Sequence, residues 1–293
     1  MLRTFLGHND TVSNIEIYEV GPRDGLQNIN YNVSTQEKID LINHLHKAGL
    51  KNMEVTSFVH PRLVPNMADA TDVFIQTSHL DDFGVLVPNQ KGFDRAWEAG
   101  AKKFNIFFSP SKAFNRVNLG RDLDQVYTDY TNMLEDIDRE DVRAYVSCAF
   151  GCPFTGKPKD WELQQVVGMA GEMANKVVLC DTIGTAIPSA VKYNIDSLRN
   201  NNYDLALHLH NNERNNTNIF QNVQAALDMG VTEFDSSIAG LGGCPFIPGS
   251  GSNLSTNQML HFAERYGYET NVDVQLLREA TTMALNWKEK CVV

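Results

Sequence analysis

Eight short apolar runs alternate with helix-like segments along this 293-residue chain. Polar or glycine-rich segments, which favour turns, follow the runs. Strands that alternate with helices predict parallel β–α units, and eight such units without a linker between them predict a closed (β/α)8 TIM barrel of the α/β class. The predicted strands span residues 14–20, 51–55, 83–87, 103–108, 142–148, 176–180, 204–210 and 232–238.

Amphipathic helices are predicted between these strands and after the last one. The first helix begins at a capping box formed by Ser34 and Glu37, and Gly49 fits its C-terminal cap. We expect a single TIM-barrel domain over residues 1–293, with the barrel at about 14–266 and an additional C-terminal helix at about 273–288. The other helices are predicted at about 67–78, 90–99, 121–137, 160–174, 188–200, 216–229 and 255–265.

An open doubly wound sheet would show the same alternation of strands and helices. That fold usually carries a glycine-rich phosphate loop, G-x-G-x-x-G, after its first strand. Here residues 21–28 read Gly-Pro-Arg-Asp-Gly-Leu-Gln-Asn instead. The sequence therefore favours the barrel.

Charge and hydropathy limit the classes of partner. The formal net charge of −11 argues against a nucleic acid, which needs a basic surface. No apolar run approaches the roughly 20 residues that span a bilayer, and residues 1–13 lack the apolar core of a signal peptide. The five cysteines are dispersed, which does not suggest a disulfide framework. We expect a cytoplasmic protein with a small-molecule substrate and no membrane partner.

Polar residues gather directly after the predicted strands. In a (β/α)8 barrel these strand ends meet at one mouth, where active sites are built. The set comprises Arg23, Asp24 and Gln27 after the first strand, Glu54 near the end of the second, Asp181 and Thr182 after the sixth, His208 and His210 at the end of the seventh, and Cys244 and Asn253 in the loop after the eighth.

His208 and His210 predict a divalent metal site, because residues two apart in a strand point to the same face. With Asp24 and the side-chain oxygen of Asn253 they form a mixed oxygen and nitrogen set that suits Mg²⁺ or Mn²⁺. Taken singly, the two histidines also fit a polar barrel lining, and Asp24 fits a turn or a helix N-cap. Asn253 alone fits better as an N-cap of the helix at 255–265.

Three charged residues fit roles beside such a metal. Arg23 can stabilise a developing enolate charge, and it can also form a salt bridge with Glu54 or Asp24. Glu54 can orient Arg23 or a water. Asp181 can do the same or transfer a proton, although an aspartate before Thr-Ile-Gly is also common in strand-to-helix turns.

Cys244 lies in a glycine-rich loop, residues 240–251. Such a loop can fold over a ligand, and a thiol there can act as an acid or a base. Most free cysteines are small buried residues without reactivity, and this is our interpretation of Cys148, Cys152 and Cys180.

These segments resemble the 3-hydroxy-3-methylglutaryl-CoA (HMG-CoA) lyase family, from Ile15 to about Lys288. The resemblance is most specific in residues 19–28 and 235–246. It implies a metal-dependent barrel lyase that cleaves HMG-CoA to acetyl-CoA and acetoacetate, as in leucine breakdown. A homodimer is also expected from barrels of this kind.

The resemblance also implies residue roles. Gln27 and Thr182 are assigned to the acyl-CoA substrate from their position after strands, and not from the resemblance. Asn286 and Lys288 match positions near the CoA nucleotide. The other matches are the Mg²⁺ or Mn²⁺ ligands Asp24, His208, His210 and Asn253, the polarising Arg23, the catalytic Cys244 and the acidic helpers Glu54 and Asp181.

The chain departs from the family pattern beside the predicted metal. Residues 211–217 replace the usual Asp-Thr-x-Gly segment, Lys112 stands in place of a glutamate, and Ser252 in place of a glycine. These changes leave open a lyase for a related 3-hydroxy-acyl-CoA, or a Claisen-type synthase related to isopropylmalate and citramalate synthases. A barrel that binds without chemistry is a third alternative, against which the retained ligand set and Cys244 argue.

Overall fold

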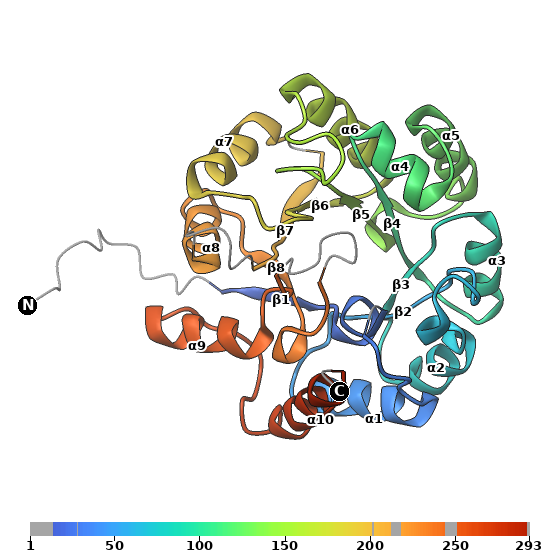
Figure 1. Cartoon of the computed structure of the whole chain (residues 1–293), viewed down its shortest axis with the longest axis vertical. Helices are drawn as coiled ribbons and strands as arrows, with labels where there is room; N and C mark the ends of the chain where they lie inside the picture. Colours follow the sequence, from blue (N-terminus) through green and yellow to red (C-terminus); the bar gives the residue numbers. More distant parts are fainter. Residues whose placement is uncertain (1–13, 28, 201, 212–217, 244–250, 292–293) are drawn as a thin grey trace, which may run out of the picture.

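The computed structural model describes residues 14–27, 29–200, 202–211, 218–243 and 251–291. Eight parallel strands form the predicted barrel, with helices around it (Figure 1), and neighbouring strands follow the order β1-β8-β7-β6-β5-β4-β3-β2. A parallel bridge between Glu19 and Met53 joins the two ends of this order. Because that bridge connects β1 to the residue before β2, the eight strands form a nearly closed ring.

The strands lie at or near the predicted runs. The second strand begins at Glu54 and not at residue 51, because Lys51 and Asn52 are exposed. The seventh ends at His208, and His210 forms an antiparallel bridge with Asn253 instead of extending the strand. The observed bounds are β1 Glu16–Glu19, β2 Glu54–Ser57, β3 Gly84–Leu86, β4 Lys103–Phe108, β5 Val142–Val146, β6 Lys176–Cys180, β7 Asp204–His208 and β8 Glu233–Ser236.

The helices surround the barrel (Figure 1). The capping box of Ser34 and Glu37 opens the first of them, and Gly49 follows its end with a positive φ of 101°. No described helix is long and apolar enough to cross a membrane. The bounds are α1 Thr35–Lys47, α2 Ala70–Thr77, α3 Gln90–Glu98, α4 Lys112–Leu119, α5 Leu123–Met133, α6 Asp160–Met173, α7 Pro188–Leu198, α8 Ile219–Asp228, α9 Thr256–Tyr266 and α10 Arg278–Lys290.

Helix α4 is absent from the sequence prediction. It is short, and the apolar pattern of only eight residues does not separate a helix from a loop. Its N-cap is Ser111, whose hydroxyl accepts a hydrogen bond from the Phe114 N–H. It ends at Gly120, which has a positive φ of 68°. Phe114, Val117 and Asn118 of this helix line a cavity at the barrel mouth.

Glu19 fixes the turn that follows β1. Its Oε1 accepts hydrogen bonds from the N–H groups of Gly21 and Ile238, each at 2.8 Å, and its Oε2 accepts one from the Thr256 hydroxyl at 2.5 Å. Gly21 begins a π-helical turn, η1 (Gly21–Gly25), which carries the polar residues predicted after the first strand. One buried carboxylate therefore ties the end of β1 to the loop after β8 and to the start of α9.

Candidate active site

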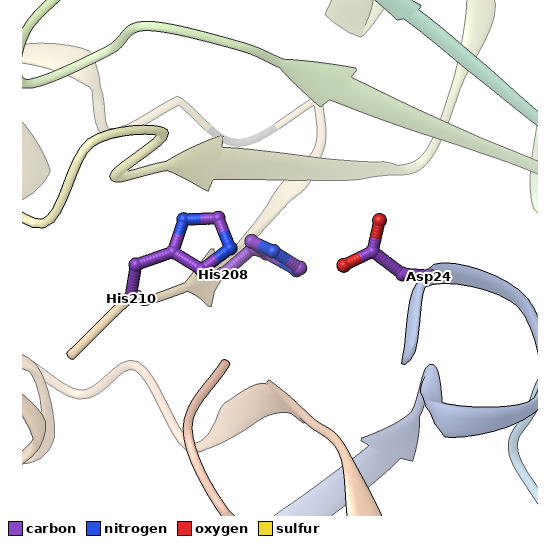
Figure 2. Close-up of side chains that lie close together, drawn as sticks. All are labelled: Asp24, His208 and His210. Atoms are coloured by element: carbon purple, nitrogen blue, oxygen red, sulfur yellow. The ribbon is translucent and has the colours of Figure 1, made fainter. Parts of the chain in front are cut away.

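The carboxylate of Asp24 and the imidazoles of His208 and His210 converge at the barrel mouth (Figure 2). One potential ligand atom from each lies within 4.8 Å of those from the other two. Asp24 comes from η1 after β1, and His208 is the last residue of β7. Only β8 separates these two strands in the ring, so residues 184 positions apart in sequence reach the same point.

Each histidine is held through its Nδ1 atom. Nδ1 of His208 lies 3.0 Å from Oδ2 of Asp235, and Nδ1 of His210 lies 2.9 Å from the backbone oxygen of Asp181. A carboxylate or carbonyl oxygen can only accept, so in each pair Nδ1 carries the proton. In the neutral form of each ring the lone pair then resides on Nε2, which is the arrangement that metal-binding histidines adopt. Burial by itself would lower the pKa of His208, but Asp235 outweighs it and raises that pKa, so a metal that binds there would displace a proton from Nε2 of His208.

The charges of the cluster suit a cation. Burial, with His208 nearby, lowers the pKa of His210 to about 4. Burial by itself would raise the pKa of Asp24, but Arg23 and His208 outweigh it and lower that pKa to about 2. At neutral pH Asp24 is therefore an anion and His210 is neutral, which are the forms that bind metal ions.

Asn253 completes the cluster with an oxygen atom. Its Nδ2 donates to Oδ2 of Asp24 at 2.7 Å and to the Leu241 carbonyl at 2.9 Å, while its Oδ1 is buried without a hydrogen-bond partner. A buried amide oxygen without a donor is unfavourable, and a cation beside it would satisfy it. Asn253 does not cap α9, because the N-cap of that helix is Ser255. The free oxygen of Asn253, together with Asp24, His208 and His210, gives a set of residues that fits a divalent metal.

Arg23 is held between two acids. Its Nε donates to Glu54 and its Nη1 to Asp24, the latter at 2.7 Å, so both of the expected salt bridges are present. The second carboxylate oxygen of Glu54 accepts from Asn105 at 2.8 Å. Burial by itself would lower the pKa of Arg23, but Glu54 and Asp24 outweigh it and raise that pKa. The guanidinium is thus charged and fixed in orientation.

The carboxylate of Asp181 faces the loop that follows β6. It accepts hydrogen bonds from the N–H groups of Thr185 and Ala186, at 2.8 and 3.0 Å. Burial raises its pKa to about 6, although these N–H groups act in the opposite direction. Its own backbone carbonyl holds His210. In this structure Asp181 therefore contacts the candidate metal site through its main chain.

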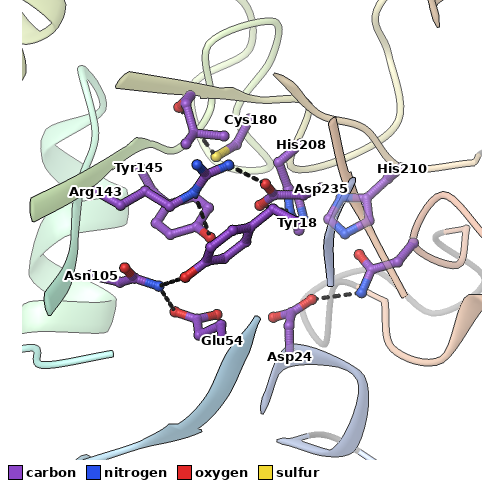
Figure 3. A network of polar contacts seen from close by, with 12 residues as sticks. Tyr18, Asp24, Glu54, Asn105, Arg143, Tyr145, Cys180, His208, His210 and Asp235 are labelled. Carbon is purple, nitrogen blue, oxygen red and sulfur yellow. Dashed lines mark hydrogen bonds and ion pairs between the residues drawn. The ribbon is translucent and has the colours of Figure 1, made fainter. Parts of the chain in front are cut away.

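A buried network below the mouth escaped the sequence analysis (Figure 3). Arg143 donates hydrogen bonds to Asp235 and Glu233 and lies over the Tyr18 ring, 4.0 Å from its centre. The Tyr18 hydroxyl accepts from Asn105 at 3.0 Å. The sequence did contain a signal for this network, namely charged residues inside otherwise apolar strands. A buried charge is unfavourable unless it is paired, so such residues indicate partners inside the barrel.

This network joins the two walls of the barrel. Asp235 holds His208, and Asn105 donates to Glu54, which in turn holds Arg23. A continuous series of contacts therefore runs inside the barrel from His208 to Arg23. A substitution between these two residues should therefore change the geometry of the barrel mouth, although the substituted residue is not itself a candidate metal ligand.

A cavity of about 720 Å³ opens at the mouth. The predicted residues on its wall are Arg23, Asp24, Gln27, Thr182, His208 and His210. Gln27 presents a buried Oε1 atom without a hydrogen-bond partner, and the Thr182 hydroxyl accepts from the Cys148 N–H at 2.7 Å. Both side chains are therefore placed to contact a ligand in the cavity.

Other predicted residues lie elsewhere. Asn286 is exposed on α10, and Lys288 donates to the carbonyls of Ala239 and Gly240 at 2.7 and 3.3 Å. Neither belongs to the cavity wall. Lys112 is exposed at the start of α4, also away from that wall. Cys244 and residues 212–217 lie outside the described residues.

Comparison with known proteins places these features in a family. The HMGL-like family model matches residues 14–284. The chain is similar to the mitochondrial hydroxymethylglutaryl-CoA lyase of Homo sapiens, with 39% identity over 271 residues, which cover 91% of this chain and 83% of that protein.

Solved structures agree with this match. The HMG-CoA lyase of Bacillus subtilis superimposes with a TM-score of 0.86 at 35% identity, covering 95% of this chain and 94% of that one. An HMG-CoA lyase from Acinetobacter baumannii, solved with coenzyme A and 3-methylmalate, gives a TM-score of 0.85 at 32% identity, covering 96% and 93%.

Proposed function

This chain belongs to the HMGL-like family, and on that premise we propose that it cleaves HMG-CoA to acetyl-CoA and acetoacetate with the help of a divalent metal. The reaction is that of a carbon–carbon lyase. The relatives that this chain matches over most of their length are named hydroxymethylglutaryl-CoA lyase. This favours lyase activity over a synthase.

One structural observation supports the proposal most directly. Asp24, His208 and His210 gather their ligand atoms within 4.8 Å, beside a buried Asn253 oxygen that has no partner. We propose that these four residues hold Mg²⁺ or Mn²⁺, which prefer mixed oxygen and imidazole ligands. When bound there, the metal supplies Lewis-acid stabilisation of negative charge on substrate oxygens.

The protein's own residues would then direct the cleavage. A base takes the proton of the substrate hydroxyl, the bond between C2 and C3 breaks, and the electron pair moves into the thioester as an enolate. The proton that the base takes up balances the one that C2 later gains. Arg23, fixed by Glu54 and Asp24, is preorganised to stabilise that negative charge. Gln27 and Thr182 bind the substrate from the cavity wall. We propose that Cys244 delivers a proton to the enolate carbon, which yields acetyl-CoA.

Glu54 and Asp181 act by orienting other groups in this proposal. Glu54 holds Arg23 through its carboxylate, and Asp181 holds His210 through its backbone carbonyl. We place Asn286 and Lys288 near the CoA nucleotide, outside the cavity. Lys288 supports this placement by its position beside the loop after β8, where it binds two carbonyls.

We also propose one catalytic domain over residues 1–293, with its barrel at about 14–266, working as a cytoplasmic homodimer in leucine breakdown. The packing of α10 against α1 and against the turn after β8 supports the proposal of a single domain. The net charge of −11 is compatible with the cytoplasm.

The test is a direct assay of the purified protein. It would be incubated with HMG-CoA and Mg²⁺ or Mn²⁺, and acetoacetate release followed with and without a chelator. We expect turnover that the chelator abolishes and added metal restores. Absence of acetoacetate, together with free CoA released from acetyl-CoA and a 2-oxo acid, would show a synthase and contradict the proposal.

A further inference from the structure

The cavity at the mouth extends well beyond the candidate metal ligands. One end contains Asp24, His208 and His210, and the other lies between α4 and the loop after β2. We call this second end the α4 arm. It is lined by the apolar side chains of Val59, Leu63, Val64, Phe107, Phe114 and Val117.

Part of this apolar lining is open to solvent. Leu63 is 81% exposed and Val117 is 57% exposed, although both belong to the cavity wall. Val117 lies one helical turn after Phe114, so the two side chains share a face of α4. Apolar side chains that remain exposed around a cavity are typical of a binding site for an apolar group.

Charge divides the cavity into two chemically different ends. Among the described residues of its wall, the permanently charged side chains are Arg23 and Asp24, and both lie at the metal end. The polar side chains of the arm are Asn89, Asn118 and His60. A carboxylate in the arm would lose water without gaining a cation. The carboxylate and hydroxyl of a substrate therefore belong at the metal end, and an alkyl group belongs in the arm.

The arm also lies away from the proposed nucleotide position. Figure 1 shows α10 beside α1, on the other side of the barrel from α4. A CoA thioester whose nucleotide lies at α10 would reach the metal from that side. The arm is then left for the group attached to the far side of the reacting carbon.

We infer that the α4 arm binds the alkyl substituent on C3 of the substrate, so that the chain accepts 3-hydroxy-3-alkylglutaryl-CoA thioesters with alkyl groups longer than methyl. The inference rests on the proposed lyase function. The hydroxyl gives up its proton, the C2–C3 bond breaks, and C2 gains a proton. The products are acetyl-CoA and a 3-oxo acid that keeps the alkyl group. The methyl group of HMG-CoA would fill only a small part of the arm.

A homologous series of substrates tests this assignment. HMG-CoA and its C3 propyl, butyl and hexyl analogues would be compared by kcat/KM for acetyl-CoA release. Full burial of a methylene predicts about a fourfold gain per carbon until the arm is full. If HMG-CoA is cleaved and kcat/KM falls steadily from methyl onwards, the inference is wrong and the proposed function stands. If no thioester in the series is cleaved, both are wrong.

Val117→Lys tests the location of the alkyl group. The substitution places a charge at the arm, and the ratio of kcat/KM for the hexyl and methyl substrates should fall at least about tenfold, as expected for a few lost methylene contacts. Val274→Lys is the matched control, because Val274 is 56% exposed and lies outside the cavity wall. It should leave the ratio unchanged.

The same variant separates the alkyl group from the pantetheine chain of CoA, which is the other part of the substrate able to fill an apolar channel. If pantetheine occupied the arm, Val117→Lys would lower kcat/KM by the same factor for every thioester. It would also weaken inhibition by CoA alone. That pair of results would overturn the inference. A lower ratio with unchanged inhibition by CoA would support it.

Discussion

Nδ1 of His208 lies 3.0 Å from Oδ2 of Asp235, and the other carboxylate oxygen of Asp235 accepts a hydrogen bond from Arg143. A guanidinium can only donate hydrogen bonds. In an Asp235→Asn variant, Arg143 therefore draws the amide oxygen toward itself and turns the NH2 group toward His208. The ring then carries its proton on Nε2, the atom that the metal needs.

We predict that Asp235→Asn lowers the affinity for Mn²⁺ by about 10- to 100-fold, the usual effect of losing a partner of a metal-binding histidine. Titration calorimetry with Mn²⁺ measures this loss without relying on activity. Glu233→Gln is the control, since Glu233 pairs with the same Arg143 but does not contact His208. Equal metal affinity in Asp235→Asn and wild type would contradict the role given to Asp235.

Arg23→Lys should reduce kcat by about 100- to 1,000-fold, as does loss of a group that stabilises the charge of a transition state. A lysine keeps the positive charge, but it lacks the planar guanidinium through which Arg23 donates to Glu54 and Asp24 at the same time. Steady-state assays with HMG-CoA would measure the loss. Arg265→Lys, at an exposed position on α9, is the control that should retain full activity.

Cys244→Ala should leave metal binding intact and remove most turnover. Loss of a group that transfers a proton costs about 10²- to 10⁴-fold in rate. Cys291→Ala serves as the control, because Cys291 follows α10 and lies outside the cavity wall. An unchanged kcat in Cys244→Ala would exclude the thiol from catalysis.

Glu19 should make stability depend on pH. Burial raises its pKa from 4.5 to about 7, although the three hydrogen bonds it accepts act in the opposite direction. The folded protein thus binds this proton more tightly than the unfolded chain. The stabilisation is complete below about pH 4.5 and is lost as pH rises through about 7, and its size is about 3 kcal/mol.

Glu19→Gln should remove this dependence. The glutamine oxygen can accept from both N–H groups that Glu19 binds, and its NH2 group can donate to the Thr256 hydroxyl. We expect the Tm of the variant minus the Tm of wild type to increase as the pH rises from 5 to 8. Parallel Tm profiles of the two proteins would contradict the raised pKa.

The order of strands and helices was predictable from sequence because it depends on local patterns. Alternating apolar runs and a capping box such as Ser34 with Glu37 act over a few residues. The (β/α)8 barrel then follows from counting units. The eight residues of α4 were missed because so short a segment carries too little pattern.

Sequence by itself also determined which residues meet at the mouth, because in a barrel all strands end on the same side. This rule brought Asp24 and His208 together without any knowledge of contacts. Only the tertiary structure decided which imidazole nitrogen is free, where the Asp181 carboxylate points and which part of the cavity is apolar. These properties depend on atoms such as those of Asp235, supplied by strands far apart in the chain and positioned to within a few tenths of an ångström by packing.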